Sequence, residues 1–136
     1  MHIGFTGTHT GMTPAQKNIV RALLFATSGN SFHHGDCVGA DAEAHDIAKE
    51  LGWFIAGHPP DNDKARAFKE CDTNWDPKPY LTRNREIVDA CELLIATPTE
   101  LDEQLRSGTW ATVRYAKKTH TNTVIIYPPG NTELVG

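Results

Sequence analysis

The chain has 136 residues, of which 39% are hydrophobic and 22% are charged. This length suffices for one globular domain with its own core, so we expect a single domain over residues 1–136. No apolar run approaches the roughly 20 residues of a membrane helix, and we expect no membrane partner. The net charge of −4 gives no overall positive field and disfavours a nucleic-acid partner.

The cysteines and the first residues bear on the cellular compartment. Cys37, Cys71 and Cys91 are an odd number and show no zinc-type spacing, so we expect free thiols in a reducing environment. No signal-peptide pattern opens the sequence. These features predict a cytoplasmic protein, and no motif indicates a resident cofactor or metal ion.

The first half of the chain predicts two strand–helix units and a third strand. Residues 3–6 are a short apolar strand, and a capping box of Thr13, Pro14 and Gln16 opens a helix that ends near Gly29. Residues 31–34 are a second strand, residues 40–51 a second helix, and residues 53–56 a strand that is apolar throughout. Such a strand is typical of a parallel sheet covered on both faces.

The second half begins with an irregular segment. Residues 58–80 contain four prolines and many charges, and we expect one short helix there, over residues 64–71. A long segment of this kind inside a compact domain is usually functional, and its position after a strand predicts that it covers the ligand edge. A helix over 81–90, a strand over 93–96, a helix from 107 towards 118 and a strand over 124–127 follow.

Five strands that alternate with helices predict a three-layer, Rossmann-like α/β fold with a mostly parallel five-stranded sheet. Right-handed crossovers place the strand-to-helix turns at one edge of such a sheet, where ligands bind. Three of these turns, at 7–11, 35–41 and 107–112, carry glycine with hydroxyl or acidic residues. Helix N-termini bind anions, so the sequence predicts a ligand that carries phosphate.

Four segments also suggest a family. Gly-Phe-Thr-Gly-Thr at 4–8 resembles a first phosphate-side turn, and residues 34–45 resemble a segment that runs from glycine to Asp-x-x-Ala-His. Residues 80–88 resemble an arginine-bearing helix, and residues 106–112 take the place of a Gly-Gly-x-Gly-Thr-x-x-Glu signature. As a set they resemble the SLOG superfamily, which unites DNA-processing protein A (Smf) with the Lonely Guy nucleotide hydrolases, and its small YspA/YpsA-like members most closely.

This resemblance covers nearly the whole chain and implies nucleotide binding. In the Lonely Guy hydrolases the last motif ends in a glutamate that assists cleavage of an N-glycosidic bond, whereas this chain has Thr112 there. The resemblance therefore implies binding more directly than hydrolysis. It also implies a homodimer formed through helices such as the one that begins at Ser107.

The three turns and the arginine-bearing helix supply the candidate site residues. Arg83 and Arg85 could grip phosphate, and we favour Arg83, because Arg85 could instead pair with Asp89 at i,i+4 spacing. Trp110 could stack on a base, lie in the core or contact a second subunit. The residues expected to bind ligand besides Arg83 are Gly7, Thr8, His9, Gly35, Gly39, Ala40, Asp41, His58, Arg85, Ser107, Gly108, Thr109 and Thr112.

The acidic residues have two interpretations. Asp36 and Asp41 could contact a ribose or take part in catalysis, or they could cap the helix start, where acids are favoured. For hydrolysis we expect Arg83, Asp36 and Glu86 to be the catalytic residues, with Asp36 or Glu86 in the role of the missing glutamate.

The histidines predict structure rather than a metal centre. His45 lies four residues after Asp41, and a buried hydrogen bond between the two is favoured over metal ligation. His33 and His34 point to opposite faces of a strand, which argues against a joint metal site. His58 ends the third strand, where it could approach a substrate or be held by the proline turn that follows.

Together these features predict binding of a nucleotide or nucleotide-derived ligand at the carboxyl edge of the sheet. An enzyme of this kind would hydrolyse the N-glycosidic bond of a nucleoside 5′-monophosphate. The alternatives are a non-catalytic nucleotide sensor and, less favoured by the charge, a single-stranded DNA binder.

Overall fold

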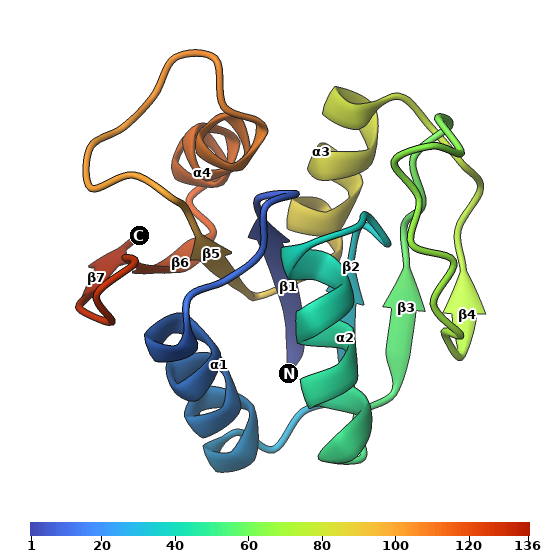
Figure 1. The fold of residues 1–136 in the computed structure, drawn as a ribbon, viewed down its shortest axis with the longest axis horizontal. Coiled ribbons are helices and arrows are strands. Elements are labelled where there is room, and N and C mark those ends of the chain that lie inside the picture. The colour runs from blue at the N-terminus through green and yellow to red at the C-terminus, as the bar shows by residue number, and fades with distance from the viewer.

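Seven strands form one sheet in the order β4-β3-β2-β1-β5-β6-β7 in the computed structural model, which describes residues 1–136 (Figure 1). All neighbouring strands are parallel except β6 and β7. The strands are β1 (His2–Gly7), β2 (Ser31–His34), β3 (Ile55–Gly57), β4 (Thr73–Asn74), β5 (Leu93–Thr97), β6 (Asn122–Ile126) and β7 (Thr132–Val135). The helices are α1 (Pro14–Ala26), α2 (Ala40–Glu50), α3 (Tyr80–Ala90) and α4 (Gly108–Lys118).

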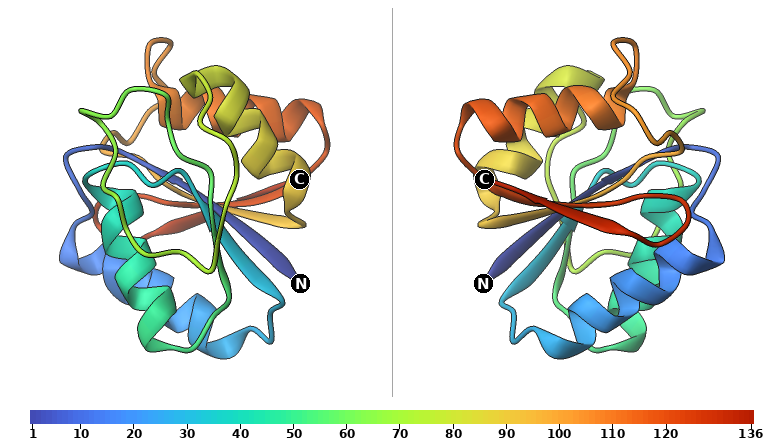
Figure 2. Two further views of the ribbon diagram at one scale, coloured as in Figure 1. Left: turned by 90° about the vertical axis from the view of Figure 1, so that its right-hand side faces the viewer. Right: turned by 90° about the vertical axis from the view of Figure 1, so that its left-hand side faces the viewer.

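The sheet lies between two layers of helices. Helices α1 and α2 cover one face and α3 and α4 cover the other (Figure 2). The apolar strands supply the core, because side chains that alternate along β1 and β5 are buried on both faces. The predicted three-layer α/β fold is therefore confirmed. None of the helices is long and apolar enough to cross a membrane.

The predicted count of five strands was wrong, because the sheet has one further strand at each edge. Strand β4 has only two residues, too few for a periodic pattern. Strand β7 returns after the turn at 128–130 and pairs antiparallel with β6, but most of its side chains are exposed, so it has no apolar run.

The helix expected over 64–71 is also not formed, because Asp36 holds this segment in an irregular path. The Asp36 carboxylate accepts hydrogen bonds from Arg66 Nε at 3.1 Å and from Lys69 N at 3.0 Å, and its carbonyl accepts from Ala67 N at 2.7 Å. These contacts outweigh the weak local preference for helix. Asp36 itself is fully buried, with φ of 50°.

The start of α1 connects distant parts of the chain. The predicted capping box is confirmed, since Gln16 N donates to Thr13 Oγ1 at 3.1 Å and Thr13 N donates to Gln16 Oε1 at 3.0 Å. The Gln16 amide nitrogen also donates to the carbonyls of Pro98, at 2.7 Å, and Ile126, at 2.9 Å. One buried side chain thus joins α1 to the ends of β5 and β6.

Candidate functional site

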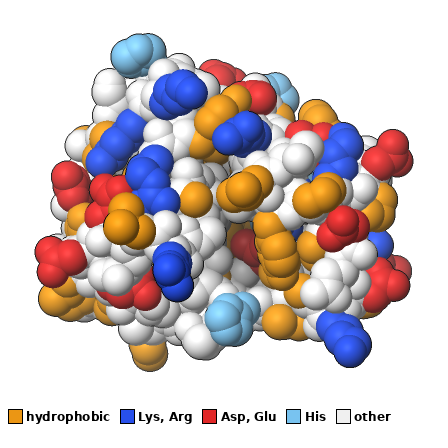
Figure 3. All heavy atoms as spheres, turned by 90° about the horizontal axis from the view of Figure 1, so that it is seen from above, with side chains coloured by type: hydrophobic (Ala, Val, Ile, Leu, Met, Phe, Trp, Pro, Cys, Tyr) orange, Lys and Arg blue, Asp and Glu red, His pale blue; other side chains and the backbone are white.

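A cavity of about 550 Å³ opens at the carboxyl edge of the sheet, between the ends of β1 and β5. The chain leaves β1 towards α1 on one face and leaves β5 towards α4 on the other. This is the topological switch point at which open α/β sheets bind ligands. Seen from above, the surface is hollowed near the centre of this face, and Lys and Arg side chains gather on one side of the hollow (Figure 3).

The turn after β1 forms one wall of the cavity and locks onto the start of α2. Ala40 N, the first amide of α2, donates to the Thr8 carbonyl at 2.9 Å. Gly39 precedes it with φ of 94°, and a Cβ at this position would run into the backbone of His9. Only glycine allows this approach. The two loops therefore pack on each other, and part of the anion-binding capacity of α2 is used within the protein.

Asp41 lies in the first turn of α2. Its buried carboxylate accepts a hydrogen bond from Cys37 N at 3.2 Å. Burial raises the pKa of Asp41 to about 6, although the nearby Arg83 acts to lower it. Negative charge at a helix N-terminus is stabilising. Asp41 thus brings a negative charge of the chain's own to the start of α2, which disfavours a phosphate there.

Arg83 forms the opposite wall and is fixed by the backbone. Its Nη1 donates to the Gly35 carbonyl at 2.5 Å and to the His58 carbonyl at 3.2 Å, and its Nε donates to Asn84 Oδ1 at 2.8 Å. A Cβ at Gly35 would collide with the guanidinium, which explains the glycine there. The remaining nitrogen, Nη2, lies 3.6 Å from Cys37 Sγ. The arginine is positioned at the cavity with most of its donors already used.

The start of α4 is more open. Ser107 caps it by accepting a hydrogen bond from Trp110 N at 3.2 Å, and the first turn contains no acidic residue. Gly108 and Thr109 are the first two residues of the helix, so their N–H groups have no helical acceptor. Arg106 stands exposed beside them and also lines the cavity. This combination of free amides and a free cation suits a phosphate.

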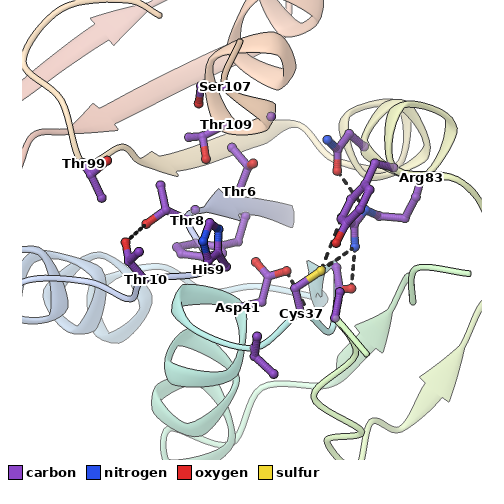
Figure 4. Close-up of a pocket in the computed structure, with 18 of the residues that line it drawn as sticks. Thr6, Thr8, His9, Thr10, Cys37, Asp41, Arg83, Thr99, Ser107 and Thr109 are labelled. Carbon is purple, nitrogen blue, oxygen red and sulfur yellow. Dashed lines mark hydrogen bonds between the residues drawn. The ribbon is translucent and has the colours of Figure 1, made fainter. Parts of the chain in front are cut away.

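Hydroxyl groups line the space between these elements. Figure 4 shows Ser107 and Thr109 at the start of α4 facing Thr6 and Thr8 at the end of β1, with Asp41, Cys37 and Arg83 on the other side. Glu100 also reaches the cavity, but its carboxylate accepts from Trp110 Nε1 at 2.9 Å and from the Thr99 hydroxyl at 2.6 Å. The cavity therefore offers donors for a polar ligand and few free carboxylates.

The structure brings most of the predicted binding residues together. Those that line the cavity are Gly7, Thr8, His9, Gly35, Asp41, Arg83, Ser107, Gly108 and Thr109. Gly39 and Ala40 lie behind this wall as packing residues. Thr112 is buried one turn into α4, where its hydroxyl donates to the Gly108 carbonyl at 2.8 Å. Trp110 lies in the core and does not face the cavity.

The other predicted residues lie outside the cavity, paired with charged or aromatic neighbours. The Asp36 carboxylate binds Arg66 and Lys69, as described above. Glu86 forms an ion pair with Lys78 and lies 3.6 Å from His58 Nδ1. His58 also bonds through Nε2 to His33 Nδ1 at 2.8 Å. Arg85 lies over the ring of Tyr115, 5.3 Å from its centroid, rather than pairing with Asp89.

The predicted hydrogen bond between Asp41 and His45 was wrong. Because the Asp41 carboxylate turns towards the Cys37 amide, His45 Nδ1 instead lies 3.0 Å from His34 Nε2. Cys71 joins this pair of histidines. The three cysteines are free thiols, as expected.

Several lining residues were missed by sequence reasoning. They are Phe5, Thr6, Thr10, Cys37, Val38, Ala65, Tyr80, Asn84, Ile87, Thr99, Glu100 and Arg106. Two signals could have indicated some of them. Thr99 and Glu100 follow the buried strand β5 after a single proline, and Arg106 precedes the capped start of a helix whose first turn lacks acids.

The chain shares its α/β fold with solved structures that include DNA processing protein A, so the predicted resemblance is confirmed at the level of the fold. The sequence itself matches no protein-family model and no curated protein.

Three solved structures illustrate this likeness. A molybdenum cofactor binding protein from Rippkaea orientalis superposes with a TM-score of 0.73 at 22% identity, covering 93% of this chain and 76% of that one. A molybdenum cofactor carrier protein from Chlamydomonas reinhardtii gives 0.67 at 23% identity, over 94% and 78% of the chains. DNA processing protein A from Helicobacter pylori, a single-stranded DNA binder, gives 0.63 at 18% identity, over 92% and 64%.

Proposed function

We propose that this protein binds a phosphate-bearing small molecule in the cavity between β1 and β5 and acts as a carrier or sensor of it. The observation that carries the proposal is the start of α4. There the unused N–H groups of Gly108 and Thr109 stand beside Arg106 at the mouth of a cavity lined with hydroxyls. A volume of about 550 Å³ is in the range of small-molecule sites.

A nucleotide or nucleotide-derived cofactor is the ligand class that we infer. The phosphate would lie on the α4 start, and the hydroxyls of Thr6, Thr8 and Thr109 would bind a sugar or a heterocycle. The proteins of the same fold support a small-molecule ligand, because two of those described above bind or carry the molybdenum cofactor. The negative net charge argues against single-stranded DNA as the main ligand.

Hydrolysis of an N-glycosidic bond is a second candidate function, supported by Asp41. This residue lines the cavity, and its pKa of about 6 makes it a reasonable general acid near neutral pH. Asp36 and Glu86 are less suited to that role, because cations already pair with their carboxylates outside the cavity. We favour binding without turnover, since the Asp41 carboxylate is itself held by the Cys37 amide.

A binding experiment with one matched pair of variants tests the proposal. Calorimetry with AMP, GMP, CMP and UMP would detect binding, and chromatography of the same samples would detect free base. Arg106→Gln removes the free cation at the cavity, whereas Arg85→Gln removes an arginine that lies over Tyr115 outside it. We expect binding without base release, and affinity about tenfold lower for Arg106→Gln only.

Other outcomes would change the conclusion. Base release that disappears in Asp41→Asn would establish the hydrolase. Equal losses in the two arginine variants would remove the α4 start as the phosphate site. Tight binding of oligonucleotides with a steep salt dependence would favour the DNA binder. Size-exclusion chromatography of the same preparation tests the homodimer that the family resemblance implies.

A further inference from the structure

Three potential metal ligands meet outside the cavity, from three separate elements. His34 ends β2, His45 lies in the middle of α2, and Cys71 stands just before β4. His34 Nε2 and His45 Nδ1 are 3.0 Å apart, and Cys71 Sγ lies 3.7 Å from the first and 3.9 Å from the second. The same three atoms thus form a closed triangle, two corners of which are nitrogen and one sulfur.

This triangle has the dimensions of one face of a zinc tetrahedron. Zinc bonds of about 2.05 Å to nitrogen and about 2.3 Å to sulfur place ligand nitrogens about 3.3 Å apart and nitrogen and sulfur about 3.6 Å apart. The observed separations differ from these values by a few tenths of an ångström. We propose that His34, His45 and Cys71 bind a zinc ion, with water as the fourth ligand. The observations that support this site do not depend on the function proposed above.

The surroundings of the triangle suit a cation. Both imidazoles are almost fully buried, and burial favours the neutral form of a histidine ring, which is the form that binds metal. Cys71 is half-buried and is therefore the most accessible of the three residues. Asp36 and Asp72 act on Cys71 more strongly than the cations Arg66 and Lys49, so the charge around the thiol is more negative than positive.

Zinc binding requires a defined movement of protons. His34 Nδ1 now accepts a hydrogen bond from Asp36 N at 2.9 Å, so Nε2 carries the hydrogen and donates it to His45 Nδ1. Zinc would displace the thiol proton of Cys71 into solvent. The His34 proton would move from Nε2 to Nδ1, because a neutral imidazole that ligates through one nitrogen is protonated on the other.

This change of tautomer connects the metal site to the cavity. An Nδ1–H on His34 would face the Asp36 N–H, so the peptide group between Gly35 and Asp36 would have to turn over. The same peptide group carries the Gly35 carbonyl that accepts from Arg83. Turning it would also take Asp36 out of the left-handed region, where φ is now 50°. Zinc binding should therefore free one donor of Arg83 towards the cavity.

Cobalt titration of the whole, chelator-treated protein tests the site. Co²⁺ bound by a thiolate gives a charge-transfer absorption band in the near ultraviolet, and zinc should abolish it. We expect one equivalent of Co²⁺ to give this band in the native protein and in Cys91→Ser, whose thiol is buried elsewhere against the Val88 carbonyl. Cys71→Ser and His45→Gln should lose it while keeping the native circular dichroism.

Nitrogen chemical shifts of the His34 ring test the proton movement. In the zinc-bound protein the hydrogen should be on Nδ1, and in the metal-free protein on Nε2. Absence of the band in the native protein, or its survival in Cys71→Ser, would overturn the site. A hydrogen that stays on Nε2 with zinc bound would overturn the link to Arg83.

Discussion

The starts of α2 and α4 reach the same cavity, but they differ in the N–H groups that they leave free to bind a ligand. At α2 a glycine turn brings the helix against the loop after β1, Ala40 N is bonded to Thr8, and Asp41 supplies its own negative charge. At α4 the Ser107 hydroxyl caps one amide and the first turn has no acid. The motif that looks most like a phosphate-binding loop is used for packing, and the plainer helix start is free for a ligand.

The largest effect is expected at Thr112, one turn into α4. Thr112→Glu would bury a carboxylate at a position that is 2% exposed and would remove the hydroxyl bonded to the Gly108 carbonyl. We expect the free energy of unfolding to fall by about 3 kcal/mol or more, with no gain of base release. The isosteric Thr112→Val should cost only about 1 kcal/mol, and urea unfolding measures both. A stable Thr112→Glu protein that releases base would show that this side chain can reach the ligand.

Alanine at Gly39 and at Gly108 should show how differently the two helix starts are packed. Gly39→Ala would place a Cβ against the His9 backbone at positive φ, and we expect a loss of about 2 kcal/mol in thermal or urea unfolding. Gly108→Ala has no atom within 4 Å of its Cβ and should change stability by less than about 0.5 kcal/mol. Similar losses at both positions would contradict the difference between the two helix starts.

Removal of helix caps offers a smaller and more selective test. Ser107→Ala and Thr13→Ala each delete an N-cap, and each should lower the unfolding free energy by about 1 kcal/mol. Only Ser107 stands at the cavity. We therefore expect nucleotide affinity to fall several-fold in Ser107→Ala and to stay unchanged in Thr13→Ala, as measured by calorimetry. A loss of affinity in both would point to general destabilisation.

The smallest expected effect concerns the charge of Asp41. Its pKa of about 6 lies above the ordinary 3.8, so the side chain is mostly ionised at pH 7.5 and mostly protonated at pH 5.5. An anion in the cavity is repelled less at the lower pH, and sulfate, whose charge is constant, should bind roughly threefold tighter there.

Four other groups act on Asp41, namely the Arg83 and Asp36 side chains and the backbone amides of Cys37 and Gly35. The titration is best measured in a His9→Gln background, which removes the imidazole that lines the cavity. Adding Asp41→Asn should abolish the difference between pH 5.5 and 7.5. If the difference persists, another group is responsible for it.

The three-layer fold and the position of the cavity could be predicted from the sequence, because both depend on local patterns. Alternating apolar segments, the capping box at Thr13 and the turn residues all act over a few neighbouring positions. The elements that were not predicted depend on partners that are distant in the sequence. Strand β4 needs pairing with β3, β7 needs pairing with β6, and the path of 64–71 is set by Asp36, some 30 residues away in sequence.

The roles of the charged residues were harder to assign for the same reason. Asp36 and Glu86 are acids at attractive positions in the sequence, but Arg66 and Lys78 reach them in space and pair with them. Cys37 lay within a recognised segment, yet no spacing rule distinguishes a side chain that lines a cavity from one that packs in the core. The carboxylates of Asp36 and Glu86 are held by ion pairs outside the cavity, and a single sequence does not show which acids are paired in this way.

Gln16 has a consequence for the order in which the chain can complete its fold. Its amide donates to carbonyls that are 82 and 110 positions away in sequence. During synthesis on the ribosome, α1 can form early, but this buried amide has no acceptor until β5 and then β6 have emerged. The first helix therefore reaches its final stability only when the last third of the chain is in place. In Gln16→Leu the final stability of α1 would no longer depend on the emergence of β5 and β6. A comparison of newly made variant and native chains would then show how much this side chain delays the completion of folding.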